Sequence, residues 1–308
     1  MQVKDFIPRK QSVGELVEQF KCTAFNARRL AEAVDVLEAM IKDKNCVKFL
    51  GLAGALVPAG MRGCIVELIQ NKWIDVIVST GANVTHDLAI GFGEHYEQCE
   101  PGTVDDANLR KRQISRIYDL LSPDKTSVDF ENGMQKILSS IGDGSFATYE
   151  LHAEIGKHVK DKQSFVRAAA EAGVKLIVPA FFDSIFGMQV WMYSQEHKLV
   201  VDERKDLEYM INLHYKLKEE GRESGALLLS GGVPKNYILQ AVLIPDKPHK
   251  YVVQITTDTP VYGGLTGATL SEAISWGKVT KESRLCTVYC DATIALPIIV
   301  SALKERLG

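Results

Sequence analysis

The sequence predicts an α/β protein with a doubly wound, mostly parallel Rossmann-like sheet and helices on both faces. Short β-branched apolar runs alternate with stretches of helical periodicity along most of the chain. The runs are apolar at successive positions, as in strands that are buried on both faces. Ligands of such folds bind beyond the carboxyl ends of the strands. A chain of 308 residues fits one large domain or two small ones, and we expect a single domain over 1–308.

The elements follow from the apolar pattern in chain order. The N-terminal segment 1–45 contains a helical pair that packs on the core. Residues 97–146 are polar and are expected to form an excursion with helices rather than a sheet strand, with the charged run LRKRQ on a solvated helix face. Strands are expected at 47–53, 74–80, 175–180, 226–230, 251–256 and 284–290, and helices at 58–72 and from about His86.

Composition excludes several classes of function. A net charge of -3 provides no broad attraction to nucleic acid or to an anionic membrane. No apolar run approaches the ~18 residues of a membrane span, and the start MQVKDFIPRKQS lacks the apolar core of a signal peptide. The six cysteines form no pair of CxxC motifs. We therefore expect free thiols, a cytoplasmic location and no metal site.

The segment SEAISWGK, residues 271–278, places a lysine directly after Trp-Gly. Burial against an aromatic wall disfavours the ammonium form and exposes the lone pair of the amine. An imine-forming lysine needs this effect, because a free lysine titrates near ~10.4. The alternative interpretation is a surface lysine after a helix that stops at Gly277.

The segment GGLTGATLSEAISWGK, residues 263–278, with the following CTVYCDAT, resembles the C-terminal signature of deoxyhypusine synthase. KFLGLAGALVPAGMRG, IDVIVSTGANVTHD, LIVPAFFDSIFG, LLLSGGVPKNY and YVVQITTDTP occur in the order of that family, so the resemblance covers roughly residues 15–308. It implies that Lys278 is the catalytic residue. It also implies a homo-oligomer, a tetramer of tight dimers in which a neighbour completes each site. Since the first strand starts near Val47, much of the family's longer N-terminal region is expected to be absent.

Small and polar residues follow all six predicted strands. Each alone is typical of a turn or a helix cap, and no GxGxxG follows the first strand. Their recurrence lets a dinucleotide approach the backbone closely, and the resemblance implies NAD as the cofactor. The residues that the resemblance implies to border NAD are Thr80, Gly81, Asp183, Gly231, Gly232, Thr257, Asp291 and Ala292. Gly54, which follows the first strand, is also expected to border the cofactor.

The resembled family oxidises spermidine with NAD, holds an aminobutyl group as a lysine imine and transfers it to a protein lysine. Glu272 and Trp276 match its substrate carboxylate and tunnel tryptophan. Met188 and Leu265 stand where the family has aspartates, so a buried ammonium would lack partners there. We therefore expect an amine other than spermidine, or an altered pose. The residues expected to bind substrate are Glu272, Trp276, His86 and Asn236, of which His86 is either a base or a structural residue.

Three functions stay open at this point. The leading hypothesis is an NAD-dependent transferase that moves an aminoalkyl group from a polyamine through an imine on Lys278. The acceptor is either a protein lysine or a small diamine, as in homospermidine synthases. The second hypothesis is a non-catalytic NAD-binding homologue, and the third is a dehydrogenase that releases the oxidised amine. The retained tryptophan and lysine favour an enzyme.

Overall fold

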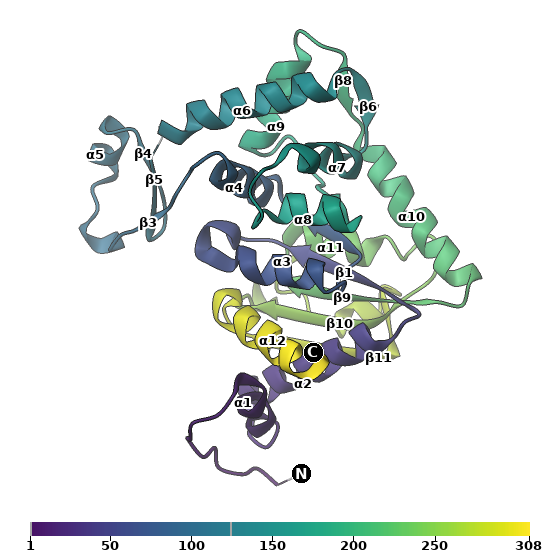
Figure 1. Ribbon diagram of the computed structural model, residues 1–308. Coiled ribbons are helices and arrows are strands. Elements are labelled where there is room, and N and C mark those ends of the chain that lie inside the picture. The colour runs from purple at the N-terminus through teal and green to yellow at the C-terminus, as the bar shows by residue number, and fades with distance from the viewer. Residues whose placement is uncertain (1, 124) are drawn as a thin grey trace.

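The computed structural model describes residues 2–123 and 125–308 (Figure 1). A six-stranded sheet with the order β11-β10-β9-β1-β2-β7 forms its centre. Every neighbouring pair in this sheet is parallel. Its strands are β1 (Cys46–Leu52), β2 (Val76–Ser79), β7 (Lys175–Ile177), β9 (Glu223–Leu229), β10 (His249–Thr256) and β11 (Val279–Tyr289).

The order of the strands reverses once, between β1 and β9. On one side of β1 lie β2 and then β7. On its other side lie β9, β10 and then β11. Leu52, the last residue of β1, is in register with Leu229, the last residue of β9. Because all six strands are parallel, their carboxyl ends lie at one edge of the sheet. The crevice beside such a reversal is the usual ligand site of an open α/β sheet.

Side chains from alternate positions of β1 enter two separate apolar clusters, since successive side chains of a strand point to opposite faces. Leu50 belongs to the cluster that includes residues of α2 (Phe25–Lys42), α3 (Arg62–Gln70) and α12 (Ala292–Leu307). Phe49 belongs to the cluster that includes residues of α10 (Glu203–Glu219) and α11 (Gly232–Gln240). The predicted mixed α/β fold with a parallel sheet and covering helices is therefore confirmed. No helix in the described part of the chain has the length and apolar character needed to cross a bilayer.

The N-terminal helical pair is also present, as α1 (Val13–Phe20) and α2. Ser12 caps α1: its hydroxyl accepts from the backbone N–H of Glu15, and the Glu15 carboxylate accepts from that of Ser12. Glu305 of α12 accepts from the backbone N–H groups of Val13 and Gly14 at 3.1 and 2.8 Å. These bonds hold α1 beside the C-terminal helix (Figure 1).

The excursion differs from its prediction. It contains helices α5 (Asp106–Lys111) and α6 (Lys125–Ile141), as expected, but also a three-stranded antiparallel sheet. Ile117 pairs with Leu120, so Tyr118 and Asp119 form a two-residue turn, with Tyr118 at a φ of 53°. Tyr-Asp lacks the glycine that signals such turns in a sequence, which is why the hairpin was missed. The strands are β3 (Glu97–Gln98), β4 (Ile114–Ile117) and β5 (Leu120–Pro123).

The helix expected from about His86 starts five residues earlier, as α4 (Gly81–Gly91). The Thr80 hydroxyl accepts from the backbone N–H of Asn83 and begins the helix directly after β2. Two short strands, β6 (Gly144–Phe146) and β8 (Leu199–Val201), pair with each other. The remaining helices are α7 (Thr148–His158), α8 (Phe165–Ala172) and α9 (Ile185–Ser194). Short helical turns are η1 (Val57–Met61), η2 (Pro101–Thr103), η3 (Pro260–Tyr262) and η4 (Glu272–Ile274).

Candidate active site

The segment that carries Lys278 is a single helical turn followed by a strand. After η4 the backbone turns at Gly277, whose φ of 69° is the left-handed conformation that glycine adopts readily. The backbone N–H of Lys278 donates to Ala273 at 3.0 Å, and its carbonyl accepts from His249 at 3.1 Å. The expected turn at Gly277 is present, and it directs the lysine into the amino end of β11.

Lys278 lines a cavity of about 350 Å³ between α11 and the 263–278 segment. Glu272, Trp276 and Asn236 line the same cavity, together with Leu265. Four of the five residues expected to act on the substrate are therefore in one place. The structure brings them together because residues 257–278 return from the end of β10 to the start of β11 alongside α11.

The Lys278 amine lies between polar and aromatic groups. Its Nζ is 3.4 Å from the Oδ1 of Asn236 and 5.6 Å from the centroid of the Trp276 ring. The Nδ2 of Asn236 donates to Gln240 at 3.0 Å, which leaves Oδ1 directed at the lysine. Burial lowers the pKa of Lys278, while the Glu272 carboxylate opposes this shift. The expected aromatic wall is present on one side only, because 62% of Trp276 is exposed.

His86 lies outside this cavity. Its Nδ1 is 2.6 Å from the hydroxyl of Tyr96, and the two rings meet edge to face. Burial lowers the pKa of His86, and the Glu94 carboxylate opposes that shift. Met188 also lies outside the cavity, 55% exposed on α9. A single chain therefore does not bring either residue to Lys278.

The residues expected to border a dinucleotide all follow strand ends at the carboxyl edge of the sheet. Two of them cap helices: Thr80 caps α4, and the Asp291 carboxylate accepts from the backbone N–H of Thr293 at 2.8 Å to cap α12. Asp183 follows β7 and Asp291 follows β11, at opposite ends of the edge. Five strand spacings of ~4.8 Å place these two carboxylates roughly 24 Å apart.

Glycines keep part of this edge open. Gly54 and Gly232 have φ values of 76° and 60°, and a Cβ added to either would meet no atom within 4 Å. At Gly231 the backbone instead contacts the 263–268 segment so closely that an added Cβ would lie 2.6 Å from the Cα of Thr266. The edge thus has bare backbone facing open space on both sides of the β1–β9 crevice.

The lysine cavity and the carboxyl edge are connected through α11. Lys278 precedes β11 and Asp291 follows it, so their backbones lie at opposite ends of that strand. The Lys278 side chain nevertheless reaches Asn236, which is one helical turn, about 6 Å, from Gly232. The amine therefore contacts a helix whose first residue follows the carboxyl end of β9.

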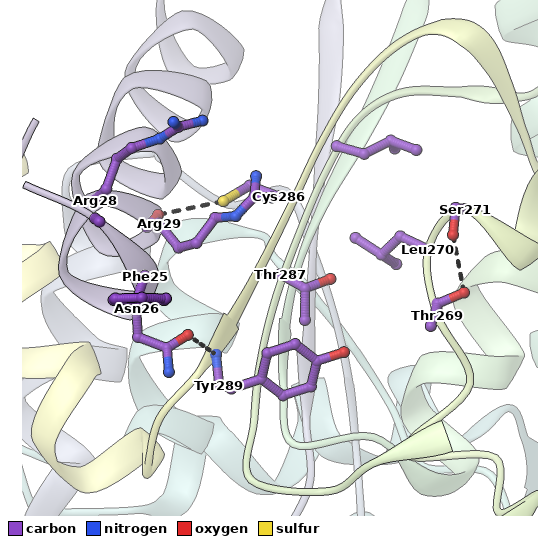
Figure 2. A pocket seen from close by; sticks show the side chains of 12 residues that line it. Phe25, Asn26, Arg28, Arg29, Thr269, Leu270, Ser271, Cys286, Thr287 and Tyr289 are labelled. Carbon is purple, nitrogen blue, oxygen red and sulfur yellow. Dashed lines mark hydrogen bonds between the residues drawn. The ribbon is translucent and has the colours of Figure 1, made fainter. Parts of the chain in front are cut away.

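A second cavity, of about 620 Å³, lies between the start of α2 and β11 (Figure 2). Arg28 and Arg29 come from α2, and Tyr289 and Cys286 from β11. Thr269 lines both this cavity and the one that contains Lys278. No residue expected to act in function lines the second cavity.

Comparison with known proteins identifies relatives of the whole chain. The deoxyhypusine synthase family model matches residues 15–303. The chain is 45% identical to "Probable deoxyhypusine synthase 1" of Methanosarcina acetivorans, over 96% of this chain and 92% of the relative. It is 41% identical to the protein of the same description in Archaeoglobus fulgidus, over 98% and 97%.

The chain belongs to the deoxyhypusine synthase family. A solved structure described as "a putative deoxyhypusine synthase from Entamoeba histolytica" shares the fold, with a TM-score of 0.68 at 19% identity, and the match covers 98% of this chain and 96% of that one. The deoxyhypusine synthase relatives imply that the protein is an enzyme, a transferase.

One residue of the Lys278 cavity was not predicted from the sequence. Lys235 is 3% exposed and lines the cavity beside Asn236. Sequence reasoning passed over it because a lysine in the first turns of a helix is ordinarily a solvated surface residue. Its place in GGVPKNY, directly before Asn236, was the available signal.

Proposed function

We propose that the protein is an NAD-dependent transferase that moves an aminoalkyl group, derived from a polyamine or related amine, through an imine on Lys278. The observation that carries the proposal is the common cavity of Lys278, Glu272, Trp276 and Asn236. Burial lowers the pKa of Lys278, so a larger fraction of its amine is uncharged and nucleophilic at neutral pH than for a surface lysine.

In the proposed reaction Lys278 acts by exchange of imines. Oxidation of the donor at a carbon next to nitrogen creates a C=N bond. The uncharged Lys278 amine adds to that carbon, the original amine leaves with a proton, and the carbon chain stays on the lysine as an imine. The acceptor amine then displaces Lys278 in the same way. Asn236 accepts a hydrogen bond from the Lys278 amine and orients it.

The carboxyl edge of the sheet fits NAD. Gly54 and Gly232 face open space, and the reversal of strand order between β1 and β9 supports a Rossmann-like site there. NAD bound there would supply the hydride acceptor for oxidation of the donor amine and the hydride for reduction of the product, so the overall transfer would be redox-neutral. Asp183 and Asp291 border NAD in this proposal, because a carboxylate at a strand end can accept from a ribose hydroxyl.

The charge of the cavity favours a donor other than spermidine in its usual pose. Among the described residues that line the cavity, Glu272 is the one acid, whereas Lys235 and Lys278 are both basic. A polycationic amine would enter a site with at most one free carboxylate. Burying its further ammonium groups without partners is unfavourable. A donor with fewer buried ammoniums therefore fits better.

A neighbouring copy of the chain completes the site in this proposal. Trp276 is 62% exposed, and Val261 and Tyr262, in the segment that leads to it, are 83% and 85% exposed. Neither His86 nor Met188 reaches Lys278 within one chain. A homo-oligomer, most simply a tetramer, would cover the apolar rim and bring such residues to the lysine.

Each chain acts as one domain in this proposal. The proposed location is the cytoplasm, and the six free cysteines support it.

The test is incubation with NAD and a panel of amines, followed by borohydride trapping and mass analysis of the protein. A fixed mass increment on Lys278 is expected, and its size reports the carbon chain transferred. Lys278→Arg serves as the control, because arginine stays protonated and forms no imine. NAD should still bind to this variant. Undiminished transfer by Lys278→Arg would refute the mechanism.

Two alternatives remain distinguishable by the same experiment. The apolar lining contributed by Leu239, Leu243 and Leu265 is compatible with a small diamine as acceptor, as in a homospermidine synthase-type enzyme. The relatives named as probable deoxyhypusine synthases favour a protein lysine. Trapping followed by addition of either acceptor separates the two. A non-catalytic homologue would bind NAD and trap no amine at all.

A further inference from the structure

Lys235 has an unusual environment for a lysine. It is 3% exposed, and its Nζ donates to three backbone carbonyls: those of Leu265 at 3.2 Å, Thr266 at 3.3 Å and Ala268 at 2.5 Å. An ammonium has three N–H donors and no acceptor. Three carbonyls therefore match the charged form, whereas a neutral amine would direct a lone pair at one of them.

These bonds fix the wall of the Lys278 cavity. Thr266 is also held from two other sides: its hydroxyl accepts from the backbone N–H of Gly232 at 3.1 Å, and its carbonyl accepts from Gln254 at 2.8 Å. Lys235 thereby ties the 265–268 segment to α11, while Gln254 ties it to β10. The backbone of Leu265, whose side chain lines the cavity, is held in place as a result.

The charge of Lys235 also acts on the cavity. The pKa of Lys235 is lowered to about 8: burial is the main cause and repulsion from Lys278 adds to it, while attraction to Glu272 and Asp258 opposes both effects. Burial lowers the pKa of Lys278, again opposed by Glu272. Two amines thus share one nearby carboxylate, and their repulsion is reciprocal: a charge on one disfavours a charge on the other.

We propose that Lys235 is a positioning residue for Lys278: its buried ammonium fixes the 265–268 wall of the cavity and opposes protonation of the Lys278 amine. The inference rests on the proposed imine function of Lys278. Lys235 acts through charge and through the wall, and it forms no bond to the substrate itself. A cation beside a catalytic lysine is one of the known ways to make that lysine nucleophilic.

The first test measures how the reactivity of Lys278 depends on pH. The protein is treated with propanal and cyanoborohydride over a pH series, and alkylation of Lys278 is followed by peptide mass analysis. In Lys235→Met alkylation at pH 7 should slow several-fold, because Lys235 of the unmodified protein is charged there, whereas rates well above the Lys235 pKa of about 8 should change little. Lys281→Met, which removes an exposed lysine of β11, should leave the rates unchanged at every pH. Equal rates at pH 7 for folded Lys235→Met and the unmodified protein would overturn the inference.

A second variant tests the charge coupling without changing Lys235, so it does not depend on how well Lys235→Met folds. Lys278→Met leaves the three carbonyl partners of Lys235 in place and removes the neighbouring charge, together with its hydrogen bond to Asn236. The ¹⁵N resonance of the Lys235 amine should then titrate at a higher pH than in the unmodified protein, because repulsion from Lys278 lowers the pKa of Lys235. Equal titration would overturn the inference. Failure of the proposed function looks different: no amine is trapped with NAD, while both pH effects persist.

Discussion

Replacement of Leu265 by aspartate should improve the use of spermidine. Leu265 lines the Lys278 cavity and stands where the resembled family signature has an aspartate. A carboxylate ~4 Å from a substrate ammonium gains about 4 kcal/mol at an effective dielectric of 20. Leu265 is 42% exposed, and solvent screening at such a position reduces the gain to about 1 kcal/mol. The expected result is a roughly fivefold lower KM for spermidine.

The structure also indicates a competitor for the new carboxylate. The Lys235 ammonium already binds the carbonyl of Leu265 at 3.2 Å, so an aspartate there can pair with Lys235 instead of substrate. Leu265→Asn is the matched control, since it introduces polarity of similar shape without charge. KM and kcat for spermidine, measured with NAD for the three proteins, show whether charge is responsible.

Met188→Asp extends this experiment to the proposed neighbour. Within one chain Met188 lies on α9, outside the cavity, so its substitution can affect spermidine only in an assembly. Equal KM values for Leu265→Asp and Leu265→Asn would refute the charge argument. A micromolar KM of the unmodified protein for spermidine, with deoxyhypusine as product, would show that other groups already replace the missing aspartates.

Three further predictions concern the cofactor, the assembly and stability. Asp291→Ala should weaken NAD binding about tenfold in calorimetry and lower the free energy of unfolding by about 1 kcal/mol, because the α12 cap is lost. Asp291→Asn should retain the cap and still bind NAD more weakly. Unchanged NAD affinity in both variants argues against the placement of NAD beside Asp291. Light scattering at micromolar concentration should show a homo-oligomer, and a monomer would contradict the shared site. Burial raises the pKa of Asp206 to about 6, so its ionisation should lower the free energy of unfolding by about 3 kcal/mol as pH rises from about 4 to 6. Asp206→Asn should lack this loss in urea unfolding. Equal dependence of the free energy of unfolding on pH in the two proteins would contradict the prediction.

The sequence was sufficient for the elements whose signals are local. Runs of β-branched residues identified the six strands of the parallel sheet, and the N-terminal pair followed from helical periodicity. The hairpin around Tyr118 could not be predicted, because a non-glycine residue at a φ of 53° carries no sequence signature. The predicted start of α4 was wrong because a threonine such as Thr80 is equally compatible with the end of a strand and with a helix N-cap.

The candidate site was predictable only where neighbouring residues share a segment. Glu272, Trp276 and Lys278 are close in sequence, so their grouping needed no knowledge of the fold. The burial of Lys235 depends on carbonyls about thirty residues away, and periodicity cannot show it. The sequence also cannot show that two residues lie far apart. His86 and Met188 align with substrate positions of the resembled family but lie outside the Lys278 cavity of their own chain.

Helix α11 borders both proposed sites. Its first residue, Gly232, borders the carboxyl edge where NAD is proposed to bind, and Lys235 and Asn236 face the lysine cavity one turn later. A shift of α11 along its axis would therefore change both sites together. Asn236, which accepts the hydrogen bond from Lys278, thus stands at the junction of the two proposed sites. Its amide can accept from the lysine but cannot carry a proton.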